Sequence, residues 1–293
     1  MKCLESSAID AAERFVWLSG RLLDRHRFAY LFRDGDAAPV LAALRAYQNA
    51  DGGFGHALEP DIRAPISQPQ PVEMALHVLD ELGAFGDPMV GAACDYLQTV
   101  TTPDGGVPFT LPSAKEYPHG FWWATDDPHP PASLNPTAAI AGLLHGHAVR
   151  HPWLERATAF CWDRLEQLER TDGYEIRCVM LFLEHVPDRA RAEAVLARVG
   201  RMLLDQGQVA LDPAAEGDVF SPLDLATEPG RAARRLFADA VIDAHLDALV
   251  DRQAEDGGWR VRWQTWTPVT DLEWRAVVTI EALHRLRAYG RWA

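Results

Sequence analysis

The sequence has little of what marks a secreted or membrane-spanning protein. Only four cysteines occur in 293 residues, and no two of them form a Cys-x-x-Cys pair. A chain of this length does not depend on disulfides, so we expect a reduced, cytoplasmic protein. Residues 1–10 lack a basic start followed by an apolar stretch, and no run of about eighteen apolar residues follows. The sequence therefore predicts neither export nor stable membrane insertion.

Positive charge is also scarce. The 28 basic residues face 42 acidic ones, which gives a formal net charge of −14. Such a surface repels the phosphates of nucleic acids and of anionic membranes, so no nucleic-acid partner is expected. Hydrophobic residues make up 48% of the chain and charged residues 24%. This balance is typical of a packed globular domain with a large core.

A polar turn motif occurs twice, near opposite ends of the chain. Gln48–Phe54 and Gln253–Trp259 both consist of glutamine, two variable residues, aspartate, two glycines and an aromatic residue. Weaker versions occupy Gln98–Val107 and Gln167–Tyr174. A motif that recurs in this way predicts a repeated architecture, in which each copy ends a helix with a sharp turn at its glycines.

Apolar residues recur at helical spacing through most of the sequence, which predicts about eleven helices. The first is expected within residues 8–32 and a late one within residues 229–252. Strongly apolar alternate helices are expected to begin at Pro71, Pro136, Pro222 and Pro268. The one candidate strand covers residues 208–211, and no segment is rich enough in linker residues to separate domains. We therefore predict one all-α domain over residues 1–293.

The motif at Gln48–Phe54 and Gln253–Trp259 resembles the repeat of terpenoid cyclases and protein prenyltransferase β-subunits. The resemblance spans nearly the whole chain, because the two strong copies lie far apart. It implies an α/α toroid, a closed barrel of inner and outer helices with the N-termini of the inner helices at one mouth. In that family the motif is structural, so these residues are assigned to the turn and not to chemistry.

Three loops, at residues 55–69, 101–134 and 206–221, precede expected inner helices and should cover that mouth. The middle loop is longer than a helical connection requires, which is typical of functional loops. Carboxyl groups beside apolar walls have raised pKa values and can protonate a substrate, while aromatic faces stabilise cations. The loop supplies both kinds of group. Its candidates are Asp126 and Asp127 for catalysis, and Trp122, Trp123 and His129 for substrate binding. The alternative is a structural loop whose tryptophans plug the barrel while Asp126 and Asp127 cap a turn.

Protonating cyclases of the resembling family carry Asp-x-Asp-Asp. Residues 124–127 match this motif except that Ala124 replaces the first aspartate, which places the general acid at Asp126. The Asp-Asp-x-x-Asp of ionising cyclases and the Asp-x-Cys order of zinc-dependent prenyltransferases are both missing. No metal or cofactor is therefore expected, except magnesium if the substrate is a diphosphate.

Further acidic residues lie near the expected helix starts. Glu59, Asp61, Glu73, Asp271 and Glu273 are substrate-binding candidates, together with Trp266. Acids in the first turn of a helix are stabilised there by the helix dipole alone, so a purely structural role is the alternative. The same holds for Asp224. Arg275, four residues after Asp271, is expected to pair with it.

Three functions are compatible with these features. The first is a terpenoid-cyclase-like enzyme that acts on an isoprenoid or other long apolar substrate in a central cavity. The second is a carbohydrate-active toroid, a lyase or hydrolase, in which tryptophans stack on sugars and separated carboxylates act as acid and base. The third is a non-catalytic toroid that binds a lipid or a peptide. The sequence assigns no oligomeric state.

Overall fold

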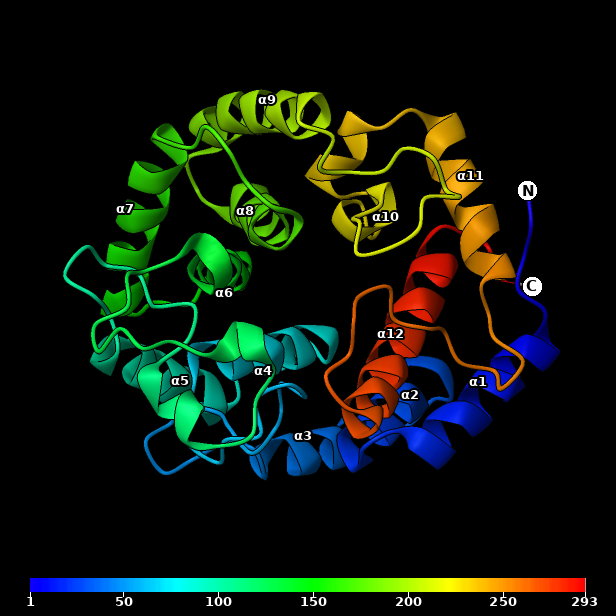
Figure 1. Ribbon diagram of the computed structural model, residues 1–293, viewed down its shortest axis with the longest axis horizontal. Helices are drawn as coiled ribbons and strands as arrows, with labels where there is room; N and C mark the ends of the chain where they lie inside the picture. The colour runs from blue at the N-terminus through cyan, green and yellow to red at the C-terminus, as the bar shows by residue number, and fades with distance from the viewer. Residues whose placement is uncertain (293) are drawn as a thin grey trace. The chain divides into compact units, whose positions relative to one another are not determined.

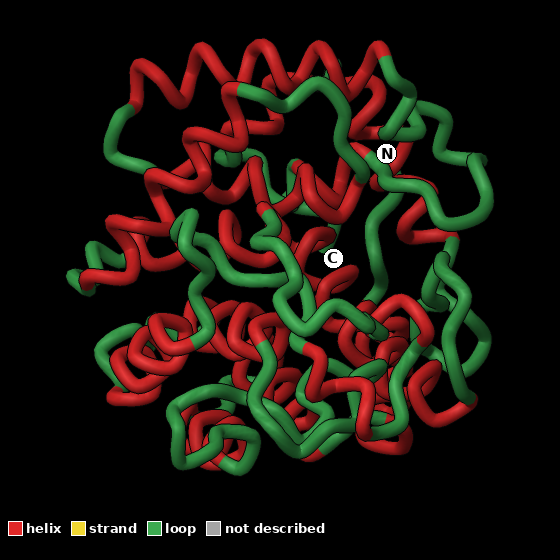
Figure 2. Tube along the Cα trace, turned by 60° about the vertical axis from the view of Figure 1, so that its left-hand side comes forward, coloured by secondary structure: helices red, strands yellow, loops and turns green. Residues whose placement is uncertain are grey.

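The computed structural model describes residues 1–292, which form helices joined by loops (Figures 1 and 2). Within this range the extended backbone makes only isolated bridges and no strand, so the all-α prediction is confirmed. The candidate strand at residues 208–211 is wrong, because Val209 forms a single bridge with Phe220. Contacts group the chain into two compact units, Leu44–Met202 and Met1–Ala43 with Leu203–Ala293. The single-domain expectation stays a prediction, and each unit is described by itself.

The unit at 44–202, called unit 2, is built around one buried helix. Its elements are α4 (Pro69–Glu81), α5 (Pro88–Thr99), η1 (Pro112–Glu116), η2 (Phe121–Trp123), α6 (Leu134–Gly146), α7 (Pro152–Glu166) and α8 (Gly173–His185), while α3 (Ala37–Arg45) and α9 (Arg189–Asp205) extend across its ends. Helix α6 lies against α4, α7 and α8 (Figure 1). A Cβ added at Gly142 would lie 2.6 Å from the Leu181 carbonyl oxygen, so α6 and α8 approach at backbone distance.

The remaining segments form unit 1. Its elements are α1 (Ser6–Ser19), α2 (Leu22–Phe32), α10 (Pro222–Leu225), η3 (Ala232–Leu236), α11 (Asp239–Asp251) and α12 (Pro268–Ala288). Helix α12 packs against α1, α2 and α11, so it holds together segments from both ends of the sequence (Figure 1). Its buried side chains include Ala276, Ile280 and Leu283.

Two expected helices are interrupted. The helix expected within residues 8–32 breaks at Gly20, whose extended backbone ends α1. The Asp24 carboxylate then accepts a hydrogen bond from the backbone N of Arg21. It also forms an ion pair with Arg21 Nε at 2.8 Å, and both contacts favour a new helix start. Residues 229–252 likewise divide into η3 and α11, and α10 after Pro222 is only four residues long. Helical periodicity missed these breaks because the apolar pattern continues on both sides of each of them.

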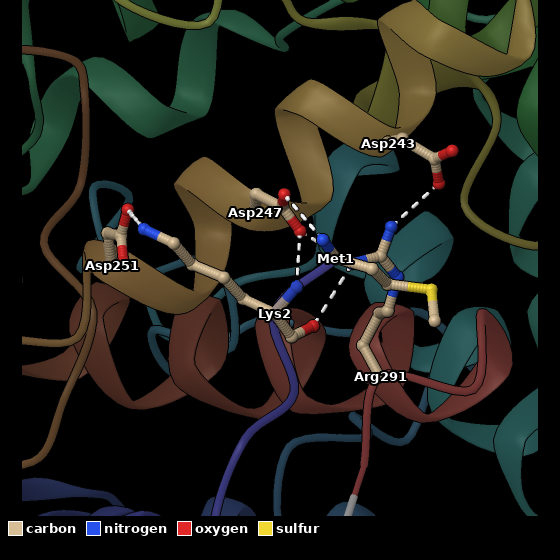
Figure 3. A network of polar contacts seen from close by, with 6 residues as sticks. All are labelled: Met1, Lys2, Asp243, Asp247, Asp251 and Arg291. Carbon is tan, nitrogen blue, oxygen red and sulfur yellow. Dashed lines mark hydrogen bonds and ion pairs between the residues drawn. The ribbon is translucent and has the colours of Figure 1, made fainter.

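Arg291 ties the two ends of unit 1 to α11 (Figure 3). Its guanidinium is buried, and its nitrogens lie 2.6 Å from Asp243 Oδ1 and 2.6 Å from Asp247 Oδ1. It also donates to the Lys2 carbonyl oxygen at 3.0 Å, and Leu4 N donates to the Arg291 carbonyl at 2.8 Å. A buried guanidinium with several acceptors in this way fixes the position of both chain segments on one helix.

The glycine motif forms the same hydrogen-bonded turn in three places. In the first copy Asn49 N donates to the Gly53 carbonyl at 2.8 Å and Gly52 N donates to the Asn49 carbonyl at 3.0 Å. The same two bonds recur at residues 254–258 and at residues 102–106. Thr101, and not Gln98, therefore occupies the glutamine position of the weaker second copy.

Each turn docks through its first glycine on the backbone of another helix, which is α5 or α7 for the first two turns and α1 for the last. Gly52 has φ +87°, and a Cβ there would lie 2.2 Å from the Ala92 carbonyl oxygen of α5. Gly257 has φ +92°, and a Cβ there would likewise lie 2.2 Å from the Ala11 carbonyl oxygen of α1. Gly105 meets the carbonyl oxygen of Arg156 in α7 in the same manner. The second glycine of each turn lies against a ring one helical turn further on, namely Tyr96, Phe160 or Phe15.

The version expected at Gln167–Tyr174 is not a copy of this turn. Asp172 instead caps α8, with its Oδ1 accepting from Glu175 N at 2.8 Å. The end of α7 is held by Arg198 of α9, whose Nη1 donates to the Leu168 carbonyl at 2.9 Å. A side-chain contact from the next long helix thus replaces the glycine contact.

Substituting the first glycine of a turn should destabilise the protein. We expect Gly52→Ala and Gly257→Ala each to lower the free energy of unfolding by about 2 kcal/mol or more, because an added Cβ needs an unfavourable backbone and overlaps a carbonyl oxygen. Gly86→Ala is the matched control, since no atom lies within 4 Å of a Cβ there. Urea unfolding followed by circular dichroism measures all three. Equal unfolding midpoints for Gly52→Ala and Gly86→Ala would contradict the docking role.

Candidate functional site

The first turn organises the loop that follows it. Asn49 Nδ2 donates to the Pro65 carbonyl at 2.9 Å, and Ser67 Oγ donates to Asp51 Oδ1 at 2.7 Å. The loop closes on itself where His56 N donates to the Ala64 carbonyl at 2.9 Å. The polar residues of the repeat motif thus fix the shape of loop 55–69, in addition to ending α3.

Loop 55–69 is joined to the middle loop, as expected for two loops at one mouth. Gly120 N donates to the Asp61 carbonyl at 2.9 Å, and Arg63 N donates to the Pro118 carbonyl at 3.0 Å. Gln68 adds a double contact, because its amide accepts from Leu111 N at 2.9 Å and donates to Ser113 Oγ at 3.0 Å. Sequence reasoning missed Gln68, whose only signal is a polar residue directly before the Pro69 helix start. The third loop, at 206–221, belongs to unit 1.

Under the joined loops lies an apolar cluster centred on Trp123. Its ring is 7% exposed and stacks on Phe109 with 4.5 Å between ring centroids. The other members are Ile62, Ala64 and Ala114, with Ile66, Tyr117 and Trp122 partly buried at the edge. Phe121, next in sequence, is 77% exposed. Trp123 is therefore a core residue of the loops, while Trp122 lies at their surface.

A pocket of about 370 Å³ opens beside Trp122. Its walls are Phe109, Trp122, Thr125 and the adjacent residues 130–133. This volume is near the lower end of the range of about 300–1,000 Å³ that drug-sized ligands occupy. The pocket therefore has room for one small group beside the Trp122 ring.

The two catalytic candidates lie on the surface. Asp126 is 86% exposed and pairs with Lys115, whose hydrogen bond and charge lower the pKa of the carboxyl group. This is the opposite of the raised pKa expected for a general acid. Asp127 Oδ1 accepts from His129 N at 2.8 Å, which is the geometry of a turn cap. Asp127 thus caps a turn, as in the structural alternative, whereas Asp126 pairs with Lys115.

Three other candidate acids of unit 2 are buried. Glu59 Oε1 accepts from Asp61 N at 2.9 Å, so this pair shapes the first loop. Glu73 on α4 is only 2% exposed, and its Oε1 lies 3.5 Å from His77 Nε2 and 3.8 Å from Arg177 Nη2. Its other oxygen, Oε2, is buried and accepts no hydrogen bond from residues 1–292. Glu73 therefore has a carboxylate oxygen left for a ligand.

The candidates near the start of α12 belong to unit 1. Trp266, Asp271 and Glu273 are all half-buried. The expected pairing of Asp271 with Arg275 is wrong, because Arg275 Nη2 lies 2.8 Å from both carboxylate oxygens of Asp256 in the last turn. Asp271 instead accepts from Thr265 Oγ1 at 3.3 Å and lies in the first helical turn.

Residues 1–292 contain no group of three His, Cys, Asp or Glu side chains arranged to hold a metal ion. In the same range, no helix combines the length and apolar character needed to cross a membrane. The expectation of magnesium for a diphosphate substrate stays a prediction.

Comparison with solved structures places the fold. No protein-family model matches the chain, and no curated protein matches its sequence. A protein from Actinoplanes superposes with a TM-score of 0.62 at 18% identity over 97% of this chain and 99% of that one. Type II terpene cyclase MstE from Scytonema superposes with a TM-score of 0.55 at 15% identity in its apo form, over 98% and 99%. The fold is terpenoid-cyclase-like.

A variant of MstE in complex with geranylgeranyl dihydroxybenzoate matches equally completely, with a TM-score of 0.58 at 13% identity over 97% of each chain. Identities this low establish the fold and nothing of the chemistry. The site must therefore be argued from the side chains of this chain.

The tryptophans of the middle loop should differ sharply in their contribution to stability. Trp123→Ala should lower the free energy of unfolding by about 3–5 kcal/mol, because it leaves a cavity under both loops. The neighbouring Phe121→Ala, at an exposed ring, should leave it nearly unchanged. Chemical denaturation of both variants makes the comparison. A Trp123→Ala protein as stable as Phe121→Ala would show that the loop cluster is not a core.

Proposed function

We propose that this protein is a terpenoid-cyclase-like enzyme whose substrate is an isoprenoid or another long apolar molecule. The observation that carries the proposal is the likeness in fold, over nearly the whole chain, to a cyclase whose structure holds a geranylgeranyl-bearing compound. The pocket beside Trp122 supports it, because an aromatic wall suits both a prenyl chain and a passing carbocation.

Glu73 is the carboxyl group that we propose for the chemistry. Protonation of an alkene forms a C–H bond with the proton of a carboxylic acid, and the resulting carbocation later returns a proton, so the product is an isomer of the substrate. The acid must therefore be shielded from water. Glu73 is buried with Oε2 unoccupied, and the side chains of His77 and Arg177 beside it are each about half exposed, so accessible surface lies close by. Asp126 does not meet this condition, since its side chain is exposed to solvent.

A second function, binding of a lipid without turnover, is favoured by one specific observation. The residue that matches the proton donor of protonating cyclases is an ionised surface carboxylate whose pKa is lowered by Lys115. A protein that kept the fold and lost the acid would retain a ligand and leave it unchanged.

Product analysis tests the first function. The purified protein is incubated with geranylgeranyl dihydroxybenzoate, geranylgeranyl diphosphate with magnesium, and squalene, and isomeric products of unchanged mass are sought by chromatography and mass spectrometry. Glu73→Gln should reduce product formation by about 100-fold or more, because the amide keeps the shape of the side chain but donates no acidic proton. Asp126→Asn, the matched control at the exposed carboxylate, should leave the rate unchanged.

The outcomes separate the alternatives. Loss of product in Asp126→Asn with full activity in Glu73→Gln would move the chemistry to the middle loop and overturn the role of Glu73. An isoprenoid lipid retained in native mass spectrometry, without any turnover, would support the binding function. Absence of both product and retained lipid would overturn the two functions together.

A further inference from the structure

Unit 1 contains a second pocket, of about 240 Å³, which is rich in arginine. It lies between α10, α11, α12 and the segment that follows the last turn. Four guanidinium groups line it, those of Arg252, Arg260, Arg262 and Arg285. In a chain whose formal net charge is −14, such a concentration of positive charge in one cavity is unusual.

One carboxylate accounts for two of these arginines. Asp224 Oδ1 lies 3.2 Å from Arg285 Nη1, and Arg262 contacts Asp224 Oδ2. Ser221 completes the shell, with its N and Oγ donating to the same carboxylate at 2.7 and 2.9 Å. Burial raises the pKa of Asp224, but Arg285, Arg262 and the Ser221 hydrogen bonds outweigh it and hold the pKa below its ordinary value. Asp224 is therefore ionised and pairs with both Arg262 and Arg285.

Neither of the other two arginines forms an ion pair with a carboxylate within residues 1–292. Arg252 donates to the Pro213 carbonyl oxygen, and Arg260 makes no hydrogen bond or ion pair in that range, although its charge lowers the pKa of Asp256. Both residues are exposed, and burial and the charge of Arg262 lower the pKa of Arg252 while the charge of Asp224 raises it. Glu281 lines the pocket but already pairs with Arg285 at 3.2 Å. The pocket thus has an excess of positive charge.

The remaining walls are apolar or neutral. His245 Nε2 lies 3.1 Å from the Leu211 carbonyl oxygen, so Nε2 carries the proton. Burial, the largest effect, lowers the pKa of His245, which is neutral at pH 7. Trp259 and Trp263 form an aromatic wall, with Trp259 Nε1 already donating to the Leu249 carbonyl at 2.8 Å. The pocket therefore has room for a small polar group beside the rings of Trp259 and Trp263.

We propose that this pocket binds a small oxyanion, a phosphate or carboxylate group, between Arg252, Arg260 and the Arg262 side of the Asp224 cluster. Guanidinium groups bind such oxygens with paired, charge-assisted hydrogen bonds. The cavity is smaller than the range of about 300–1,000 Å³ for drug-sized ligands, so it holds an anionic group and not a whole isoprenoid. The inference does not depend on the proposed function, because it uses only residues of unit 1.

Isothermal titration calorimetry of the full chain tests the site, with inorganic phosphate, phenyl phosphate and benzoate as probes at low ionic strength. Arg260→Met should weaken binding about tenfold, since it removes a charge-assisted contact while the Asp224 cluster stays intact. Arg14→Met, at an exposed arginine of α1 in the same unit, is the matched control and should bind as the wild type does. Stronger binding of phenyl phosphate than of phosphate would assign the anion to a larger ligand with a ring or chain, and equal binding would assign it to the free ion.

Asp224→Asn gives a second test, because it should increase the affinity for phosphate instead of lowering it. It removes the built-in anion that shares Arg262 and Arg285, so a folded variant should bind phosphate about tenfold more tightly. A purely structural carboxylate would give no gain in affinity. The proposal is overturned if none of the three probes binds at about 10 mM or below, or if Arg260→Met binds as tightly as Arg14→Met.

Discussion

The contact between a glycine and a backbone carbonyl oxygen of another helix is the constraint on which the rest of the structure depends. Gly52 and Gly257 have no Cβ to keep the turn away from α5 and α1, so turn and helix meet at backbone distance. The ring that follows one helical turn later then covers the second glycine. Because close packing tolerates few changes in volume, each such contact fixes both the separation and the orientation of the segments that it joins.

The same turn also shapes the loops around the pocket of unit 2. Its Asn49 and Asp51 side chains shape loop 55–69, and Gln68 at the end of that loop holds the middle loop by its amide. The Trp123 cluster and the pocket beside Trp122 follow from this connection. Residues that carry no chemistry therefore position those that could, and the family motif is informative about the site only through this indirect route.

Local patterns predicted the fold well and the site poorly, for a physical reason. The turn motif and the helical periodicity are set by neighbouring residues, so the sequence shows them directly. The burial and the ion pairs of a carboxyl group, however, depend on residues that are distant in the sequence. Asp126 resembles a cyclase acid by its neighbours, but Lys115 and open solvent make it an ordinary surface anion. Arg275 likewise pairs with Asp256, nineteen residues away, and not with its helical neighbour Asp271.

Breaks between helices and replaced contacts are hidden from the sequence in the same way. The end of α7, for example, depends on Arg198 from another helix. The arginine pocket draws on α10, α11, α12 and the last turn, and no spacing in the sequence brings these residues together. Polar residues that act in tertiary contacts leave no periodic signal.

The docking of the last turn on α1 also sets the order in which the protein can be completed. Gln253 Nε2 donates to the Ala8 carbonyl across 245 residues, whereas the equivalent bond from Gln48 to the Met89 carbonyl spans 41. The longer closure costs about 1.5 kcal/mol more in chain entropy, and during synthesis its turn is made after all of unit 2. Unit 2 can therefore fold during synthesis, whereas α1 must wait for residues 253–259 before its Phe15 ring is covered by Gly258.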